Sequence, residues 1–307
     1  MNYPHRPVNS MNALALALSV PKGRLGHHFR SKSRYFTLHE SLNAAEDPNS
    51  RKIWYAPHPD LKALHRQLNK AFLNQVTLPA YIVGGVTGRS YADACRLHAN
   101  SKSVIRLDIE AFYESVLEQD VHRIWRELFT FAPDVAQWLT EMTTVQGQLP
   151  RGAPASTALA NLVFFDREPE IAEFLAKHNL RYSRYIDDIA ISCLDRITVA
   201  DVRLAIEQVQ SMLRTSMTLR DTKTRVSHAP NALTVHNVNV NREPTVPKRK
   251  RREIRARVHR IKQQIRTHGM DDALSHQLER LRGTLSWLKQ FHPEVATEYL
   301  ESFKEVA

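Results

Sequence analysis

The chain of 307 residues has few glycines and few cysteines. Its nine glycines are well below the average usage of roughly 7%, which argues against Gly-rich all-β architectures. It contains neither G-x-x-x-x-G-K-[ST] nor G-x-G-x-x-G, so a P-loop and a dinucleotide fingerprint are excluded. Cys95 and Cys193 permit at most one disulfide and cannot alone build a four-ligand zinc site. We expect a reducing, cytoplasmic setting.

Long hydrophobic runs are also missing. The apolar stretch nearest the start, residues 13–20, is too short to span a bilayer. A signal peptide is disfavoured because Pro21-Lys22-Gly23-Arg24 follows this stretch and Arg6 is the only fixed positive charge before it. We expect an N-terminal helix that packs on the rest of the protein.

Positive charge, by contrast, is abundant and unevenly placed. The chain has 43 Lys and Arg against 32 Asp and Glu, a net charge of +11 with a pI near 9.8. This favours a polyanionic partner, with nucleic acid the first candidate and an acidic membrane surface the second. Nine of the basic residues fall in positions 248–262, where an apolar seam at helical spacing predicts a helix with a basic outer face. A solvated basic helix without a partner is the alternative.

The hydrophobic periodicity predicts a mixed α and β fold. Strands are expected at 51–55 and 104–108, a hairpin-like strand pattern at 181–192, and helices after residue 60 and over the last sixty residues. The sequence Gly152-Ala153-Pro154 predicts a helix that begins with proline in its first turn. Free backbone donors at such a helix start suit a phosphate or a base edge, although an ordinary capped core helix fits equally well.

Two adjacent aspartates interrupt an otherwise apolar, β-branched pattern. Asp187 and Asp188 must point to opposite faces of a strand, or lie together at the tip of a hairpin. Asp108 ends the predicted strand 104–108 and can meet such a tip from the same sheet. Carboxylates held close together favour a bound cation, and water and phosphate oxygens would complete a two-metal Mg²⁺ site. Considered alone, Asp187 and Asp188 are better explained by a plain surface turn, because aspartate is a common turn residue.

Three strings in order carry a family resemblance: Asp-x-x-x-Phe-Tyr from Asp108, then Leu-Pro-x-Gly-x-Pro-x-Ser-x-x-Leu-Ala-Asn from Leu149, then Tyr-x-Asp-Asp from Tyr185. This order resembles motifs A, B and C of reverse transcriptases, and most of all the retron reverse transcriptases and related phage-defence enzymes of bacteria. The resemblance covers roughly residues 50–300.

It implies an α+β right-hand polymerase with fingers, an antiparallel palm sheet and a helical thumb. The implied division is an N-terminal segment and fingers (1–103), a palm with interleaved fingers elements (104–232), and a palm–thumb junction with a basic thumb (233–307). No room is then expected for an RNase H, endonuclease or integrase domain.

The resemblance also implies roles for individual residues. Asp108, Asp187 and Asp188 would be catalytic and hold two Mg²⁺ ions, with deoxynucleoside triphosphates (dNTPs) as substrates. Tyr113 would exclude a ribose 2′-hydroxyl, and Lys223 would assist the leaving pyrophosphate. The residues expected to bind the nucleotide are Arg51, Lys52, Tyr113, Arg151, Gly152 and Lys223. The residues expected to bind RNA are Lys248, Arg249, Arg251, Arg252, Arg255 and Arg260.

By the same resemblance, the expected activity is RNA-directed DNA synthesis on a cognate structured non-coding RNA, which acts as template and as primer scaffold. We also expect an msDNA-type cDNA product, a role in antiviral defence and a separate effector protein. We expect no membrane partner. Two alternatives stay open: a defence polymerase that makes template-independent or repeat DNA, and a catalytically idle RNA-binding scaffold.

Overall fold

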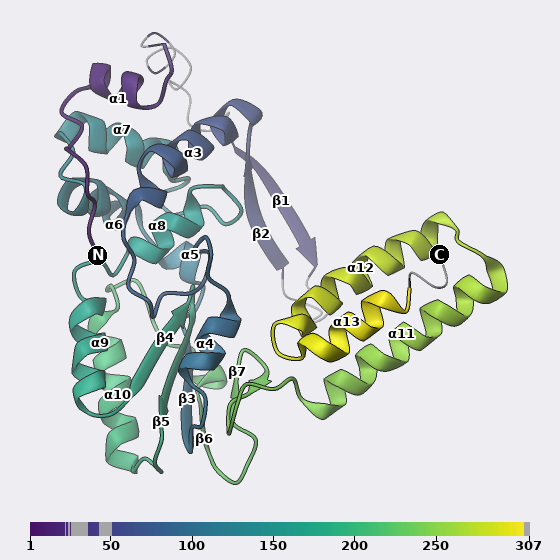
Figure 1. The fold of residues 1–307 in the computed structure, drawn as a ribbon. Coiled ribbons are helices and arrows are strands. Elements are labelled where there is room, and N and C mark those ends of the chain that lie inside the picture. The colour runs from purple at the N-terminus through teal and green to yellow at the C-terminus, as the bar shows by residue number, and fades with distance from the viewer. Residues whose placement is uncertain (22, 24, 26–35, 43–50, 304–307) are drawn as a thin grey trace.

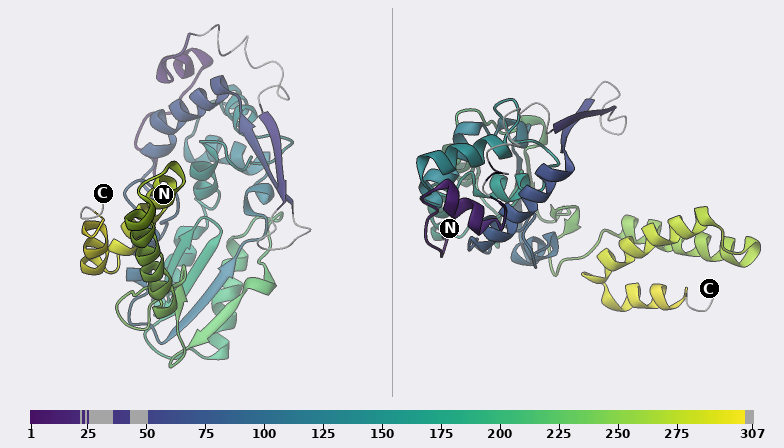
Figure 2. Two further views of the ribbon diagram at one scale, coloured as in Figure 1. Left: turned by 90° about the vertical axis from the view of Figure 1, so that its right-hand side faces the viewer. Right: turned by 90° about the horizontal axis from the view of Figure 1, so that it is seen from above.

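The computed structural model describes residues 1–21, 23, 25, 36–42 and 51–303. Figure 1 shows two parts: a body formed by the chain before residue 248, and a helical arm, residues 248–303, that extends to one side of it. The view from above in Figure 2 shows the arm reaching away from the body. In the described ranges, no helix is long and apolar enough to cross a membrane.

A four-stranded antiparallel sheet lies in the body, with the strand order β4-β5-β3-β6. Its strands are β3 (Ser103–Asp108), β4 (Arg181–Tyr185), β5 (Asp188–Cys193) and β6 (Arg225–His228). The predicted strand and hairpin are confirmed. The β4–β5 turn consists of Ile186 and Asp187, and Asp188 is the first residue of β5, directly opposite Asp108 of β3.

Helices cover this sheet and extend the body above it (Figure 1). Helix α4 (Tyr91–Leu97) and helix α9 (Glu168–Lys177) both contact β4, and α10 (Val199–Met212) packs against α9. Helix α10 begins with a capping box formed by Thr198 and Asp201. His98, which follows α4, contacts Ser192 on β5 and Ser183 on β4 with its two ring nitrogens, at 2.7 and 2.8 Å.

The upper body begins with the predicted N-terminal helix, α1 (Met11–Ala17), which contacts α7 (Pro133–Thr143). Strands β1 (Phe36–Leu42) and β2 (Arg51–Pro57) form an antiparallel hairpin that reaches toward the arm in Figure 1. Helix α3 (Pro59–Ala71) follows with its apolar side buried, as its spacing predicts. Between β3 and α7 lie the short helices α5 (Phe112–Ser115) and α6 (Glu118–Arg123) and a π-helical turn, Ile124–Leu128.

One helix start differs from its prediction. Helix α8 spans Ser156–Leu162, so Pro154 lies before the helix and not in its first turn. Gly152 has a φ of 96°, a left-handed conformation that glycine adopts without strain. The chain therefore turns through residues 151–155 before the helix begins, and the backbone around Gly152 belongs to a loop.

The arm consists of α11 (Lys248–His268), α12 (Asp272–Lys289) and α13 (Pro293–Glu301), and it has a hydrophobic core of its own. Two apolar stripes are buried there: Ile254, Val258, Ile261 and Ile265 on α11, and Leu274, Leu278, Leu281, Leu285 and Leu288 on α12. The two-residue strands β7 (Thr234–Val235) and β8 (Val238–Asn239) precede the arm. Trp287 and Phe291 of the arm pack against a small apolar cluster of the body.

Candidate active site

The structure brings the three predicted aspartates to one end of the sheet. Asp108 ends β3 and is 6% exposed. Asp187 lies in the β4–β5 turn, where its carbonyl accepts a hydrogen bond from Ile109 N at 3.1 Å. Asp188 pairs with Asp108 across the two strands, and residues directly opposite in an antiparallel pair share a face. Three carboxylates thus lie close enough to influence each other's ionisation.

Burial, together with repulsion from neighbouring carboxylates, raises the pKa of Asp187 and of Asp188. Burial and the charge of Asp108 raise the pKa of Asp187. Desolvation, followed by the charges of Asp187 and Asp108, raises the pKa of Asp188 to about 6, although 57% of that side chain is exposed. Because like charges oppose ionisation, a cation among these carboxylates would favour their charged forms.

Two basic side chains already neutralise Asp108. Lys223 Nζ lies 3.2 Å from its Oδ2, and Arg220 Nε lies 3.4 Å from its Oδ1. Arg220 also donates its backbone N–H to the carbonyl of Asp108 at 2.8 Å. The predicted residue Lys223 therefore lies at the carboxylates, half-exposed, where it is free to turn toward another anion.

The carboxylates carry the ligand chemistry that Mg²⁺ prefers, namely oxygen donors with negative charge. Within the described residues, however, no group of three or more His, Cys, Asp and Glu side chains is arranged to hold a metal ion. The donor set and its charge therefore fit Mg²⁺, while the side chains are not gathered into a closed cluster. Ion pairs with Lys223 and Arg220 engage both oxygens of Asp108 in this arrangement.

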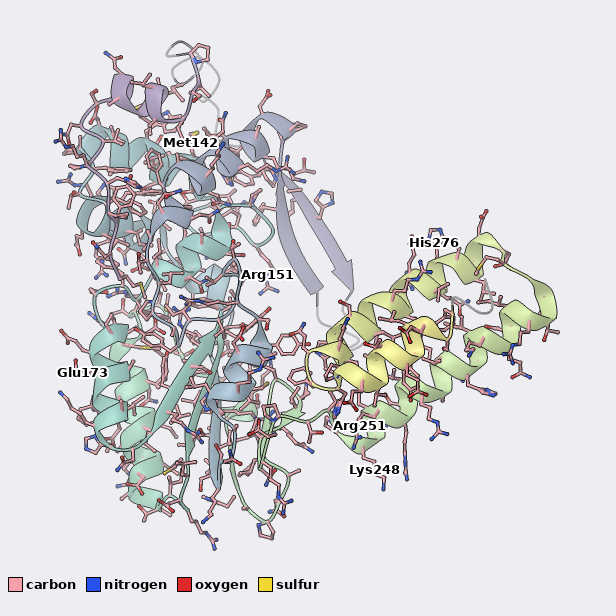
Figure 3. All side chains as sticks on the ribbon, in the orientation of Figure 1. Met142, Arg151, Glu173, Lys248, Arg251 and His276 are labelled. Atoms are coloured by element: carbon pink, nitrogen blue, oxygen red, sulfur yellow. The ribbon has the colours of Figure 1, made fainter. Side chains whose placement is uncertain are left out.

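The predicted nucleotide-binding residues Tyr113 and Arg151 lie together beside the aspartates. The Tyr113 hydroxyl is 3.2 Å from Oγ1 of Thr157, and the Arg151 guanidinium lies 5.8 Å from the centre of the Tyr113 ring. Arg151 also contacts Glu114 at 3.3 Å, and its carbonyl accepts a hydrogen bond from Tyr55 N of β2. Figure 3 shows Arg151 on the side of the body that faces the β1–β2 hairpin and the arm.

The other predicted residues are placed less closely. Gly152 follows Arg151 in the same loop and is exposed. Arg51 and Lys52 lie at the start of β2, and their side chains are outside the described part of the structure. The six predicted RNA-binding residues are all exposed on α11, and Figure 3 shows Lys248 and Arg251 at the beginning of that helix. Arg252, Arg255 and Arg260 line one depression of about 460 Å³ on the arm, separate from the aspartates.

Two residues at the site were missed by sequence reasoning. His236, in the turn between β7 and β8, has Nδ1 3.8 Å from Oδ2 of Asp188 and packs edge-on against Tyr185. Burial, then the charge of Arg106, lowers the pKa of His236 to about 4, so it faces Asp188 as a neutral ring at neutral pH. Arg220 is the second. Its only sequence signal was its position three residues before Lys223.

Comparison with known proteins shows the family to which most of the chain belongs. The family described as "Reverse transcriptase (RNA-dependent DNA polymerase)" matches residues 47–271. The chain is similar to the Retron Se72 reverse transcriptase of Salmonella heidelberg, with 30% identity over 86% of this chain and 71% of the relative. It is 24% identical to the Retron Ec48 reverse transcriptase of Escherichia coli, over 97% of this chain and 75% of the relative.

A third relative is the Retron Mx65 reverse transcriptase of Myxococcus xanthus, 28% identical over 92% of this chain and 68% of the relative. Among solved structures, the chain is similar to an apo telomerase from Candida Tropicalis, with a TM-score of 0.42 and 12% identity over 61% of this chain and 44% of that one.

The chain belongs to the reverse transcriptase family and, within it, to the retron type. It is accordingly an RNA-directed DNA polymerase.

Proposed function

We propose that the protein copies a cognate structured non-coding RNA into a msDNA-type cDNA, as part of a cytoplasmic antiviral defence system with a separate effector protein. The observation that carries the catalytic part is the meeting of Asp108, Asp187 and Asp188 at one end of the sheet, next to Lys223 and Arg220. The relatives named as retron reverse transcriptases support the RNA template and the cDNA product.

In this proposal the body corresponds to fingers and palm, with the boundaries 1–103 and 104–232, and residues 233–307 form the junction and thumb. The antiparallel sheet would be the palm, and the helical arm would be the thumb (Figure 1). The β1–β2 hairpin and Arg151 would then face the incoming dNTP from the fingers side.

Asp108, Asp187 and Asp188 would hold two Mg²⁺ ions. When bound, the ions would stabilise the developing charge on the attacking and leaving oxygens of nucleotidyl transfer. Lys223 lies where it can exchange Asp108 for the departing pyrophosphate, because an ammonium pairs readily with phosphate as a point charge. Arg220 would remain paired with Asp108 while Lys223 contacts the pyrophosphate.

The remaining side chains would hold the dNTP. Arg151 is held against the Tyr113 ring and Glu114, so its guanidinium is fixed in direction and can contact a phosphate or a base edge. The Tyr113 ring, which is half-buried and contacts Thr157 through its hydroxyl, would exclude a 2′-hydroxyl. Arg51 and Lys52 would contact the triphosphate from β2.

Outside the active site, the exposed basic face of α11 would hold the RNA through its phosphates and its shape, since folded RNA is recognised largely in this way.

The test combines one substitution with sequencing. Asp187→Asn removes one carboxylate charge at nearly unchanged volume, and we expect Mg²⁺- and dNTP-dependent DNA synthesis to fall at least about 100-fold. The matched control is Asp195→Asn, an exposed aspartate beyond the other end of β5, which should keep full activity. Thermal unfolding checks that both variants are folded.

The product and the bound RNA decide between the alternatives. The protein is purified from its native locus with its RNA, and RNA and new DNA are sequenced. DNA complementary to one bound RNA supports the proposal. Homopolymer or repeat DNA unrelated to that RNA would point to template-independent synthesis. Bound RNA without any DNA synthesis by the wild type would point to the scaffold.

A further inference from the structure

A buried arginine near the end of β4, separated by Tyr185 from the β4–β5 turn (Ile186 and Asp187, called the catalytic turn below), has no role in the mechanism above. Arg184 of β4 is 0% exposed, and Glu168, at the start of α9, is also 0% exposed. The two side chains form a bidentate ion pair, in which Arg184 donates from Nε to Oε1 of Glu168 at 2.6 Å and from Nη2 to Oε2 at 2.7 Å. A pair buried to this degree persists only when its remaining donors are satisfied.

The remaining donors of Arg184 all find acceptors. Nη2 donates to the carbonyl of Asn161 at 3.0 Å, and Nη1 donates to Oδ1 of Asn161 at 3.4 Å and to the carbonyl of Ile186 at 3.1 Å. Together with the two bonds to Glu168, these contacts engage the five N–H groups of a guanidinium. Only one of the five reaches the catalytic turn, and it ends on Ile186.

Ile186 is the residue of the turn that most needs support. Its φ is 59°, a left-handed value that is a genuine outlier for a β-branched residue. Backbone in such a region persists when the surroundings over-determine it. The turn dictates the direction of Asp187, which follows Ile186 directly, and the start of β5 at Asp188.

The backbone of Gly84 also approaches the turn closely. A Cβ on Gly84 would lie 2.7 Å from the Ile186 nitrogen and 2.9 Å from Tyr185, so residue 84 must be glycine for the two segments to approach. Asn161 fixes this segment by donating from Nδ2 to the Gly84 carbonyl at 2.7 Å. Arg184 and Gly84 therefore both lie against Ile186, and both are linked through Asn161.

We propose that Arg184, held by Glu168 and Asn161, is a positioning residue that fixes the strained Ile186 backbone and thereby the direction of the metal-binding carboxylates of Asp187 and Asp188. This inference rests on the proposed catalytic role of those aspartates. An ion pair that merely stabilised the core would have no need of a donor on the turn carbonyl. Partners that orient metal ligands typically change metal affinity or activity by about 10- to 100-fold when removed.

The body offers a matched control in Arg214, a second buried arginine that is 6% exposed. It donates to the carbonyl of Val163 and pairs with Asp166 and Asp120, but has no contact with the β4–β5 turn. Arg184→Lys and Arg214→Lys each keep a positive charge and lose the fixed fork of a guanidinium. Both should therefore lower thermal stability.

Wild type and the two variants are compared by thermal unfolding, by kcat and the KM for dNTP on a primed RNA template, and by the Mg²⁺ concentration for half-maximal activity. For Arg184→Lys we expect kcat to fall about 10- to 100-fold and the Mg²⁺ requirement to rise, with KM for dNTP little changed and with partial rescue at high Mg²⁺. Arg214→Lys should keep the wild-type Mg²⁺ requirement.

The inference is overturned if Arg184→Lys folds and shows the wild-type Mg²⁺ requirement and kcat, or if Arg214→Lys shifts both to the same extent. Should Arg184→Lys fail to fold, the triple variant Arg184→Met, Glu168→Leu, Tyr182→Phe replaces the network by apolar groups, including the Tyr182 hydroxyl that donates to Glu168. It should fold and show the same loss. A wild type that makes no DNA would instead refute the proposed function.

Discussion

The acidic end of the sheet and the basic face of the arm are charged in opposite senses and built in opposite ways. At the sheet end, a few charges are held by individual contacts, such as the pair between Asp108 and Lys223 at 3.2 Å. On α11, many charges lie exposed over an apolar seam that packs independently of the body. Chemistry at one phosphate requires fixed groups, whereas holding a long polyanion requires charge density.

The largest effect expected on the arm tests that density. Replacing Arg252, Arg255 and Arg260 by Ala removes three cations from one depression on α11. We expect RNA affinity to fall by roughly tenfold or more and the dependence of log affinity on log salt to flatten by about 0.7 to 0.9 for each phosphate that the variant no longer neutralises. Filter binding with the co-purified RNA across a salt series measures both.

The control removes the same number of charges elsewhere: Lys177, Arg196 and Arg203, all exposed on the α9–α10 side of the body, are changed to Ala. Its salt dependence should equal that of the wild type. Equal reductions in both triple variants would show that net charge alone holds the RNA, and that α11 is no special surface.

A smaller effect is expected on the pH dependence of stability at the sheet end, where burial and neighbouring carboxylates raise the pKa of Asp188. Because the pKa of Asp188 is raised to about 6 in the folded protein, above the usual value near 4, its ionisation opposes folding. The stabilising contribution of the protonated Asp188 carboxyl is fully present below about pH 4 and is lost as pH rises through about 6. In Mg²⁺-free buffer, Asp188→Asn should therefore unfold at a higher temperature than wild type at pH 8, with little difference at pH 4.

Added Mg²⁺ should reverse this ranking at pH 8, because the wild type gains a ligand that the variant binds less well. At limiting Mg²⁺, DNA synthesis by the wild type should fall as pH decreases below about 6, since metal binding requires the ionised carboxylate and itself favours that form. If Asp188→Asn is not stabilised at pH 8, the raised pKa of Asp188 is contradicted.

The smallest effects come from two glycines, one in each region. Gly85, beside the catalytic turn, has a φ of 66°, and a Cβ there would lie 2.2 Å from Cγ2 of Thr157. Gly85→Ala should lower the free energy of unfolding by more than about 1 kcal/mol. Gly283, inside α12, has nothing within 4 Å of an added Cβ, so Gly283→Ala should raise it by up to about 1 kcal/mol. Denaturant unfolding measures both, and a reversed order would contradict the structure at these positions.

Much of the fold could be predicted because its signals are local. The stripes of α11 and α12, the strand before Asp108 and the hairpin around Asp187 all follow from periodicity within short windows. The predicted start of α8 was wrong because Pro154 fits both the first turn of a helix and a turn before it. The left-handed conformation of Gly152 decides for the turn.

The supporting contacts of the site could not be predicted from sequence patterns. Arg184 and Glu168 are 16 residues apart in the sequence, and the packing of α9 against β4 brings them together. His236 reaches Asp188 from beyond β6, through a two-residue turn whose residues both have positive φ. The prediction that Asp108, Asp187 and Asp188 are catalytic remains a prediction, as do the roles of Arg51 and Lys52, although the structure brings the three aspartates together.

The separate core of the arm also has a consequence for biosynthesis. All of α11 to α13 follows the last strand of the sheet in the sequence, so a ribosome working at about 5–20 residues per second completes the body before it makes the basic helix. The contacts among the helices of the arm are close in sequence, so they can form quickly once these helices have been made. The nascent chain thus contains all three aspartates of the sheet before the exposed basic face of α11 has been made.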